Sequence, residues 1–408
     1  MKDFREAKTW FPFFTNHPNE VYFDNSATTL KPQSVINAIV DYYAKYGTNP
    51  HNTDSDLAYQ TAAKFQEVRV KVQQFINAPK VEEIVFTAGT TAGINQIAYG
   101  LKSIMQPGDE IFLTQQEHGA NILPWYRLAK ECQGKIKYLP EQNYQIDITA
   151  LEKVIGPQTK IVTFANIPNI LGYENDVQGI VKRIKTINPN IIVVVDCAQG
   201  VLHTKTDVQE WGADFIVFSA HKMFGPTGVG ILWGKTNLLE QLEPLLLGGG
   251  MNSAINPTDL TYHKKSIPAR FEGGTPNASG IFGFGAALDF IQKIGLDNII
   301  SYAESLKAYA VRQFDQHLSD KVIIYNKTTP TPILVFNIKE VFAQDVATHL
   351  GTIDHITVRS GDHCARLIGG VINEKNTVRI SFTIYNDKND IDKLVQAIKN
   401  ETTFLGRL

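Results

Sequence analysis

Short apolar runs alternate with helix-length segments through the first two-thirds of the chain, and this alternation restricts the fold more than any other feature of the sequence. The runs that are typical of strands lie at residues 83–87, 110–114, 160–165, 191–196, 214–218 and 229–233. Segments of helical length, such as residues 92–104 and 120–132, separate several of them. This pattern predicts an α/β fold, in which a largely parallel sheet is covered by helices on both faces. The run 191–195, IIVVV, fits a strand that is buried on both sides.

The pattern changes near residue 295, which suggests a second domain. A long amphipathic segment at 297–318 leads into short strand-like and helix-like segments at 333–337, 343–350, 355–359 and 377–382, with a final helix from residue 387. We therefore expect a large domain over residues 20–294 and a smaller α+β domain over residues 295–408, to which residues 1–19 are joined. A length of 408 residues fits two domains.

Charge and hydropathy exclude several classes of protein. Lys and Arg total 39 against 41 Asp and Glu, so the chain lacks the positive charge expected of a nucleic-acid binder. No apolar run approaches the ~18 residues of a membrane span. Charged residues near the N-terminus interrupt any signal-peptide pattern, and the three cysteines are far apart, without a CxxC motif. We expect a cytoplasmic protein without disulfides, and no metal site, because metal-binding motifs such as HExxH are absent from the sequence.

A polar segment, SAHKMFGPTG at residues 219–228, follows one of the predicted strands directly. Open α/β sheets bind ligands at the carboxyl ends of their parallel strands, so this segment lies where a site is expected. Ser219 and His221 are suitable donors to a phosphate, and a partly desolvated Lys222 is a suitable Schiff-base nucleophile. The alternative for any lysine in a loop is an ordinary solvated side chain.

Two further segments suggest the cofactor. Asp196 ends the most apolar strand, where it is either a turn carboxylate or the partner of a pyridinium nitrogen. A carboxylate and a Schiff-base lysine are the electronic pair that pyridoxal phosphate (PLP) requires. Thr90 and Thr91 follow another strand at the start of a predicted helix. Free N–H groups and hydroxyls there make an anion cradle, although an ordinary helix cap would look the same.

Eight motifs occur in the order found in one enzyme family. They are DNSATT at 24–29, FTAGTTAGIN at 86–95, EHGAN at 117–121, PNILG at 168–172, VDCAQ at 195–199, SAHKMFGPTG at 219–228, RFEGGTPN at 270–277 and RSGDHCA at 359–365. Over residues 11–398 the chain closely resembles a SUF-type (group II, NifS-like) cysteine desulfurase of the class V aminotransferase family. The resemblance implies a fold-type I PLP-dependent transferase, with a mostly parallel seven-stranded sheet, that works as a homodimer.

The resemblance also implies roles for individual residues. Lys222 forms the Schiff base with PLP, Asp196 pairs with the pyridine nitrogen, and Gln199 bonds the phenolic oxygen. His118 stacks on the ring and shuttles protons. The implied phosphate contacts are Thr90, Thr91, Ser219 and His221, with Thr275 supplied by the other subunit, and the implied substrate contacts are Asn169, Arg359 and Arg379. Arg379 is expected to clamp the substrate carboxylate in bidentate geometry.

Among the three cysteines, the resemblance selects Cys364 as the nucleophile that takes up sulfur. Cys132 lies in a helical pattern and Cys197 ends a strand, so both fit small core residues. Cys364 lies in a polar loop close in sequence to Arg359, His363 and Arg366. We expect these cations to favour the thiolate and Asp362 to oppose it.

The function implied is removal of sulfur from L-cysteine, which gives L-alanine and a persulfide on Cys364. A sulfur-acceptor protein would then carry the sulfur to iron–sulfur cluster or thio-cofactor assembly. A selenocysteine lyase, or another PLP lyase of class V, is the enzymatic alternative. An inactive scaffold that binds sulfur-carrier proteins is the alternative from another class, because fold alone does not dictate function.

Several positions depart from the family pattern. Gly119 stands where the family usually has a second histidine, and Asp362 replaces the first histidine of Gly-His-His-Cys. A family motif with two histidines is replaced by residues 51–56, HNTDSD, which include Asn52 and Ser55. We expect these departures to affect the acceptor partner, the rate and any activity toward selenocysteine, and not the cofactor chemistry.

Overall fold

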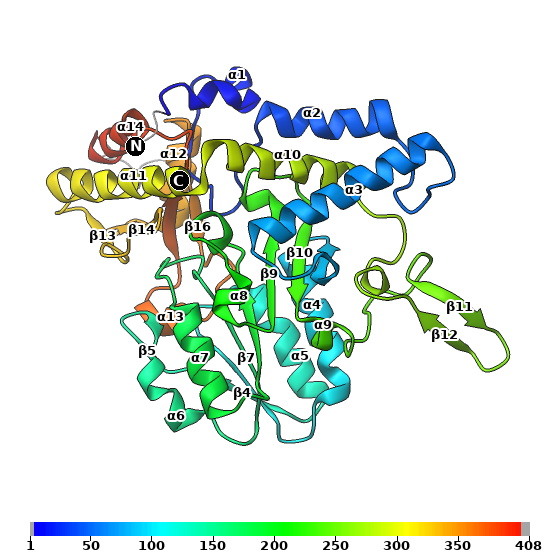
Figure 1. Ribbon diagram of the computed structural model, residues 1–408. Coiled ribbons are helices and arrows are strands. Elements are labelled where there is room, and N and C mark those ends of the chain that lie inside the picture. The colour runs from blue at the N-terminus through cyan, green and yellow to red at the C-terminus, as the bar shows by residue number, and fades with distance from the viewer. Residues whose placement is uncertain (1–3, 401–408) are drawn as a thin grey trace.

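A seven-stranded sheet forms the centre of the molecule (Figure 1). The computed structural model describes residues 4–400, so the outermost residues of the predicted smaller domain, 1–3 and 401–408, lie outside the described residues. In spatial order the strands are β2 (Ile84–Thr87), β10 (Gly230–Gly234), β9 (Phe215–Ser219), β8 (Ile192–Asp196), β7 (Thr159–Ala165), β3 (Glu110–Leu113) and β4 (Lys135–Tyr138). Only β10 within this sheet runs antiparallel to its neighbours. The predicted α/β fold with a mostly parallel sheet is confirmed.

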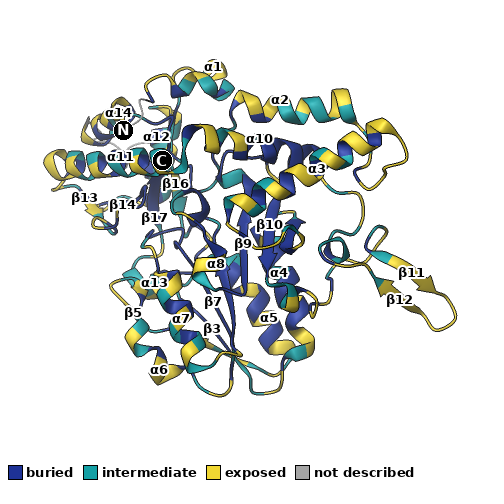
Figure 2. Ribbon diagram, in the orientation of Figure 1, coloured by how far each residue is buried: buried dark blue, intermediate teal, exposed yellow. Residues whose placement is uncertain are grey.

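The central strands of the sheet are buried on both faces because they are apolar at nearly every position (Figure 2). In β8, Val193 and Val195 join one apolar cluster, whereas Ile192 and Val194 join the cluster on the opposite face. Successive side chains of a strand point to opposite faces, so a run of five apolar residues fits only a doubly covered strand.

Helices cover both faces of this sheet (Figure 1). One face packs against α3 (Asp56–Phe75), α7 (Val177–Ile187), α8 (Val208–Trp211) and α10 (Ala278–Ile294), and the other against α4 (Thr90–Gly100) and α5 (Leu123–Glu131). Further helices at the edges of this part are α2 (Gln33–Asp41), α6 (Leu151–Val154) and α9 (Thr236–Leu239).

Helix α10 is not identified by the sequence patterns described above. It is buried around most of its circumference, so it carries no amphipathic stripe. Its glycines allow close packing: a Cβ on Gly285 would lie 2.6 Å from a Val68 methyl of α3.

A second, four-stranded antiparallel sheet lies beside the first part (Figure 1). Its strands, in spatial order, are β13 (Val322–Ile324), β14 (Ile333–Ile338), β17 (Thr377–Ser381) and β16 (Arg359–Gly361), and its helices are α11 (Leu296–His317), α12 (Ala343–Thr352) and α14 (Lys388–Asn400). The predicted strand 355–359 is divided, because β15 (Ile356–Thr357) leaves this sheet to pair with β1 (Val21–Tyr22). The domain boundary at 294/295 falls between α10 and α11 and stays a prediction.

Residues 24–31, which we call the N-terminal strap, connect the two sheets. Asp24 forms a parallel bridge with Ser381, the last residue of β17. Further along the strap, the backbone N–H of Thr29 donates to the carbonyl of His221, beyond the end of β9. The strap therefore contacts the large sheet and the small sheet within a few residues.

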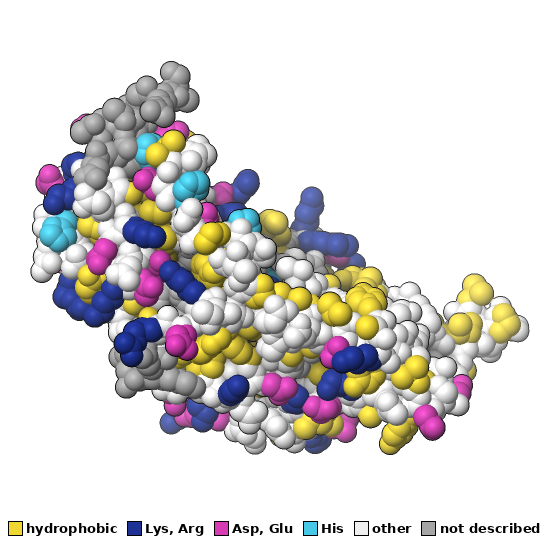
Figure 3. Space-filling view, turned by 90° about the horizontal axis from the view of Figure 1, so that it is seen from above, with side chains coloured by type: hydrophobic (Ala, Val, Ile, Leu, Met, Phe, Trp, Pro, Cys, Tyr) yellow, Lys and Arg dark blue, Asp and Glu magenta, His cyan; other side chains and the backbone are white. Residues whose placement is uncertain are grey.

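A two-stranded hairpin extends away from the body of the molecule (Figure 1). It consists of β11 (Asn252–Asn256) and β12 (Thr261–Lys264), and most of its residues are exposed (Figure 2). Ile255 and Leu260 are among its exposed apolar side chains, and the view from above shows the hairpin standing clear of the rest (Figure 3). The hairpin belongs to the long Gly/Pro-rich segment 247–276, and segments of this length are usually functional.

Within residues 4–400, no helix has both the length and the apolar composition needed to cross a bilayer. The same residues contain no group of three His, Cys, Asp or Glu side chains placed to hold a metal ion.

Candidate active site

A cavity of about 300 Å³ lies at the carboxyl ends of β7, β8 and β9, within the size range of small-molecule sites. The structure brings together in its lining all but one of the predicted site residues: Thr90, Thr91, His118, Asn169, Asp196, Gln199, Ser219, His221, Lys222, Arg359, Cys364 and Arg379. Thr275 is the exception, and it does not line this cavity. Ser26, Ala27 and His363 also line the cavity.

Asp196 and Lys222 follow two adjacent parallel strands, β8 and β9, so both side chains reach the same edge of the sheet. Burial lowers the pKa of Lys222 to about 8, although Asp196 acts in the opposite direction. Burial also raises the pKa of Asp196, while a hydrogen bond from the Ala198 N–H and the charge of Lys222 lower it. A buried carboxylate and an amine that loses its proton near neutral pH therefore share this cavity.

The start of α4 forms a polar corner of the cavity. The Thr90 N–H donates to Ser219 Oγ over 2.8 Å, and the two hydroxyl oxygens lie 2.7 Å apart. Gly89 permits this approach: its φ is +143°, and a Cβ there would lie 3.3 Å from Ser219 Oγ. The result is a group of hydroxyls at a helix N-terminus, which suits an anion.

Two histidines in the cavity are neutral at pH 7. Burial, aided by the charges of Lys222 and Arg379, lowers the pKa of His118 to about 4. Burial and the charge of Lys222 lower the pKa of His221 to about 4 as well. The Ala120 N–H donates to His118 Nδ1 over 3.0 Å, so a neutral His118 carries its proton on Nε2.

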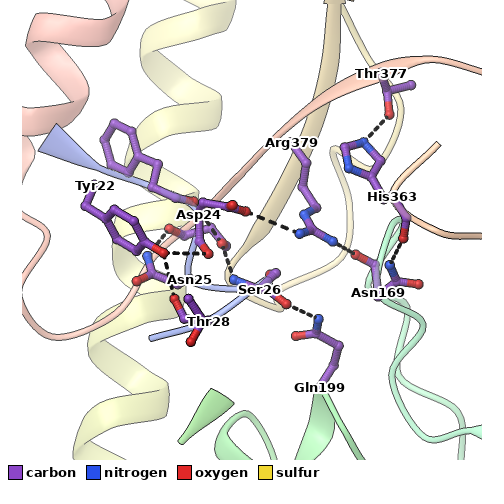
Figure 4. A network of polar contacts seen from close by, with 12 residues as sticks. Tyr22, Asp24, Asn25, Ser26, Thr28, Asn169, Gln199, His363, Thr377 and Arg379 are labelled. Atoms are coloured by element: carbon purple, nitrogen blue, oxygen red, sulfur yellow. Dashed lines mark hydrogen bonds and ion pairs between the residues drawn. The ribbon is translucent and has the colours of Figure 1, made fainter. Parts of the chain in front are cut away.

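The N-terminal strap fixes the backbone around Lys222. The carbonyl of His221 accepts from the Thr29 N–H at 3.0 Å, from Thr28 Oγ1 at 3.0 Å and from Lys31 Nζ at 3.2 Å. Gln199 is tied to the same strap, because its Nε2 donates to the Ser26 carbonyl over 2.7 Å (Figure 4). Two of the predicted cofactor contacts thus depend on the strap for their position.

Arg379 is buried, and not all of its guanidinium nitrogens have a hydrogen-bond partner (Figure 4). Its Nη1 donates to the Asn169 carbonyl over 2.8 Å, and its Nη2 lies 3.4 Å from Asp24 Oδ1. Nε of Arg379 and Oδ1 of Asn169 are buried without a hydrogen-bond partner in the protein. Because leaving such groups unpaired is costly, they mark where a polar ligand is expected to bind.

Cys364 is exposed at the cavity and its loop is held by three hydrogen bonds. The Gly119 N–H donates to the Cys364 carbonyl at 2.7 Å, Asn169 Nδ2 to the His363 carbonyl at 2.8 Å, and the Cys364 N–H to Asp362 Oδ1 at 2.8 Å. His363 and Cys364 both have a positive φ, +49° and +59°. Two such residues in succession are unusual, and the hydrogen bonds hold the loop in this conformation.

The expectation that His363 adds a positive charge beside Cys364 is wrong. His363 is buried, its Nε2 is hydrogen-bonded to Thr377 Oγ1 at 2.9 Å, and burial holds its pKa well below the ordinary value (Figure 4). Arg366 pairs with Asp362 at 3.1 Å, so these two charges largely offset one another. Of the cations close to Cys364 in sequence, Arg359 remains as a positive charge that lines the cavity. Arg379, its partner in the β16–β17 pairing, is a second one.

The departures from the family pattern have local structural explanations. Gly119 still donates its backbone N–H to Cys364, and a Cβ there would just touch the same carbonyl, at 3.4 Å. Ser55 Oγ caps α3 by accepting from the Ala58 N–H, and Asn52 Oδ1 accepts from the Asp54 N–H in a tight turn. Asn52 and Ser55 do not line the cavity.

The loop that carries Thr275 is anchored firmly although it lies away from this cavity. Glu272 forms a buried bidentate ion pair with Arg69, at 2.8 Å for each contact, and accepts from the Phe86 N–H. The Gly274 N–H donates to the Gly249 carbonyl at 2.8 Å. Thr275 is thus presented by a rigid loop near the base of the hairpin.

The donor set fits PLP. The hydroxyls and amide groups at the start of α4 suit a phosphate, Asp196 suits a protonated ring nitrogen, and Lys222 is an amine with a lowered pKa. The neutral imidazole of His118 lines the same cavity.

Comparisons with known proteins agree along nearly the whole chain. Residues 21–394 match the family model described as aminotransferase class-V. A probable cysteine desulfurase of Ureaplasma parvum serovar 3 is 43% identical over 394 residues, which cover 97% of this chain and 96% of the relative. An apo cysteine desulfurase from Thermococcus onnurineus NA1 matches with a TM-score of 0.91 at 33% identity, covering 98% of each chain. The cysteine desulfurase CsdA (S-sulfonic acid) from Escherichia coli gives a TM-score of 0.90 at 32% identity and the same coverage.

Proposed function

This chain belongs to the class V aminotransferase family, and from that premise we propose that it is a SUF-type, group II enzyme that carries sulfur on Cys364. It is a PLP-dependent cysteine desulfurase, and its substrate is L-cysteine. The observation that supports the proposed sulfur carrier is the exposure of Cys364 at a cavity that Lys222 and Arg379 also line.

Groups from three strand ends would hold the cofactor. Thr90, Thr91, Ser219 and His221 would bind its phosphate, Asp196 its ring nitrogen and Gln199 its phenolic oxygen, and Lys222 would supply the amine for the Schiff base. When bound, PLP supplies an electron sink that allows the Cα–H bond of an amino acid to break.

The protein's own groups position the substrate and move protons. Arg379 binds the substrate carboxylate, with Nε as a free donor, while Asn169 and Arg359 line the same region. Lys222 and His118 are the proton carriers: Lys222 changes charge near neutral pH, and the neutral His118 presents a protonated Nε2.

Sulfur leaves the substrate by nucleophilic attack of the Cys364 thiolate. A bond forms between Cys364 Sγ and the substrate sulfur, and the substrate C–S bond breaks. The electron pair of that bond stays with the carbon skeleton, which takes up protons and leaves as L-alanine. Cys364 then carries a persulfide for an acceptor protein.

The direct experiment is incubation of the purified protein with L-cysteine, followed by an assay for alanine. We expect a yellow protein whose visible absorption band shifts on addition of L-cysteine. With L-cysteine near one equivalent per site and no added reductant, alanine should form in a single turnover, because the persulfide blocks a second cycle until a thiol removes it. With excess L-cysteine, alanine should form continuously and faster when a reductant or an acceptor protein is added. Alanine formation with no dependence on an acceptor would argue against a stored persulfide.

We also propose that the protein delivers sulfur to iron–sulfur cluster or thio-cofactor assembly in the cytoplasm. The three cysteines are free, which suits a reducing compartment. Because Arg366 and Asp362 offset one another beside Cys364, we expect the acceptor to recognise shape around the loop and not a strong local charge.

The active enzyme is proposed to be a homodimer in which Thr275 reaches the phosphate of the other subunit. Thr275 lies outside its own cavity, on an anchored loop. Large hydrophobic side chains are also exposed on the adjacent hairpin and on α2 and α3, among them Ile255, Leu260, Val40 and Tyr59. A second copy would bury such surface.

Mixed dimers test the sharing of sites. Subunits with Lys222→Ala lack the nucleophile, and subunits with Thr275→Ala have a weakened phosphate site. If Thr275 acts on the neighbouring subunit, each hybrid contains one fully restored site, and activity returns to about half that of the wild-type dimer. Purified hybrids that regain nothing would show that Thr275 serves its own subunit.

The lowered pKa of Lys222 gives a pH prediction for cofactor uptake. Only the neutral amine attacks the aldehyde of PLP, and burial lowers the pKa of Lys222 to about 8. The rate of PLP uptake by the apoprotein should therefore rise as the pH increases through about 8, and not near the ordinary lysine value of about 10.4. Stopped-flow absorbance between pH 6 and 10 measures this; a midpoint near 10 would contradict it.

A further inference from the structure

Asp24 is a largely buried carboxylate with no role in the chemistry described above, yet it contacts the proposed substrate clamp. Its side chain is only 14% exposed, and Oδ1 lies 3.4 Å from Arg379 Nη2. On the other side of the guanidinium, Nη1 donates to the Asn169 carbonyl over 2.8 Å (Figure 4). These two contacts leave Nε of Arg379 as the donor without a partner.

The backbone around Asp24 fixes the direction of its side chain. The Asp24 carbonyl accepts from the N–H groups of Ala27 and Thr28, which closes a turn. The Ser381 N–H donates to the Phe23 carbonyl, and the Ser26 N–H donates to Ser381 Oγ at 2.8 Å. Residues on both sides of Asp24 are therefore held by β17, the strand that carries Arg379.

The charges around Asp24 require a carboxylate at this position. Arg359 and Arg379 are directly opposite one another in the β16–β17 pairing, so two positive charges are close together. Burial raises the pKa of Asp24, and both arginines, together with Lys222, lower it. Asp24 is the counter-ion of this group, and Tyr22, whose hydroxyl donates to the Thr28 carbonyl, packs beside it.

We propose that Asp24 is a positioning residue for substrate binding: with the Asn169 carbonyl, it holds the Arg379 guanidinium so that Nε faces the α-carboxylate of the amino acid. This inference rests on the proposed role of Arg379 as the carboxylate clamp. It adds that the clamp is oriented by the N-terminal strap, and that selectivity for a carboxylate depends on Asp24.

A binding experiment separates this role from a general effect on folding. The holoenzyme is titrated with L-alanine, which carries a carboxylate and no thiol, and with L-alaninamide, which carries a neutral amide in its place. The shift of the visible absorption band gives a dissociation constant for each ligand without turnover. Asp24→Asn should raise the constant for L-alanine by about tenfold, as expected for one charge-assisted contact, and leave that for L-alaninamide within about twofold.

Two companion variants complete the test. Asp24→Glu keeps the charge and should retain part of the preference for L-alanine that Asp24→Asn loses. If Asp24→Asn does not fold, Asp24→Ser removes the same charge and takes its place. Arg379→Lys should remove the preference, and the double variant with Asp24→Asn should be no worse than Arg379→Lys alone, because the two residues act through one contact.

Asp214→Asn is the matched control. Asp214 is a buried carboxylate paired with Lys185 and Lys235 at the opposite end of β9, so its loss should lower stability and leave the ligand preference unchanged. If Asp24→Asn weakens both ligands equally, or neither, the positioning role is wrong. If Arg379→Lys leaves L-alanine binding intact, the proposed carboxylate clamp itself fails.

Discussion

Replacing Cys364 by alanine is expected to leave PLP bound and to stop the formation of alanine from L-cysteine. The proposed cofactor contacts include Thr90, Asp196, Ser219 and Lys222, none of which is hydrogen-bonded to the Cys364 side chain, so the visible spectrum and its shift with L-cysteine should persist. The rate of alanine formation should fall by at least about a hundredfold, because the nucleophile that accepts the sulfur is lost.

Cys132→Ala is the matched control for this experiment. Cys132 lies at the end of α5, away from the cavity, so the variant should keep full activity. Selenocysteine discriminates between mechanisms, since a selenol leaves more readily without a nucleophile and should still be partly processed by Cys364→Ala. Near-normal alanine formation from L-cysteine would reject the persulfide mechanism and favour a lyase.

Replacing Lys222 by alanine should abolish turnover and the covalent link to the cofactor. Lys222 lies beyond the carboxyl end of β9 and is the one lysine among the residues that line the cavity. No second lysine of that lining can therefore substitute for it. Activity should fall by at least about a thousandfold, the scale expected when a covalent catalytic group is removed.

Borohydride reduction followed by peptide mapping provides the direct readout. In the wild-type protein the pyridoxyl group should appear on Lys222, and the Lys222→Ala variant should carry none. Lys235→Ala, which loses an ion pair with Asp214 and a hydrogen bond to the Gly212 carbonyl, is the control and should be labelled like the wild type. A label on a lysine other than Lys222 in the wild-type protein would show that the assignment is wrong.

The large sheet could be predicted because its strands are buried on both faces and are therefore continuous apolar runs. Every strand expected from such a run is present, with shifts of one residue at some ends. Strand β4 could not be predicted in this way, because it lies at the sheet edge and three of its four residues are exposed. Helix α10 could not be predicted from an amphipathic pattern, because it is apolar around most of its surface.

Several cavity residues could be named from motifs because Thr90, Asp196, Ser219 and Lys222 end or follow strands at the same edge of the large sheet. Their environment could not be predicted. His363 is next to Cys364 in sequence, but burial lowers its pKa and makes it neutral; its place against Thr377 depends on how β16 and β17 pair. Asp24 is the first residue of the DNSATT motif, but the motif predicts no role for it. Its contact with Arg379 joins residues at opposite ends of the chain, which no local pattern shows.

The strap also determines when a newly made chain can become competent to bind its substrate. Asn25 and Ser381, which are hydrogen-bonded to each other, are 356 positions apart, whereas the strands that end at Asp196 and Ser219 are neighbours in sequence. Contacts over such a separation form late, and a chain is synthesised from its N-terminus. The half of the cavity that suits PLP can therefore assemble while synthesis continues. The half that suits an amino-acid carboxylate must wait for the last strand, so a protein truncated before residue 377 would retain the first half and lack the second.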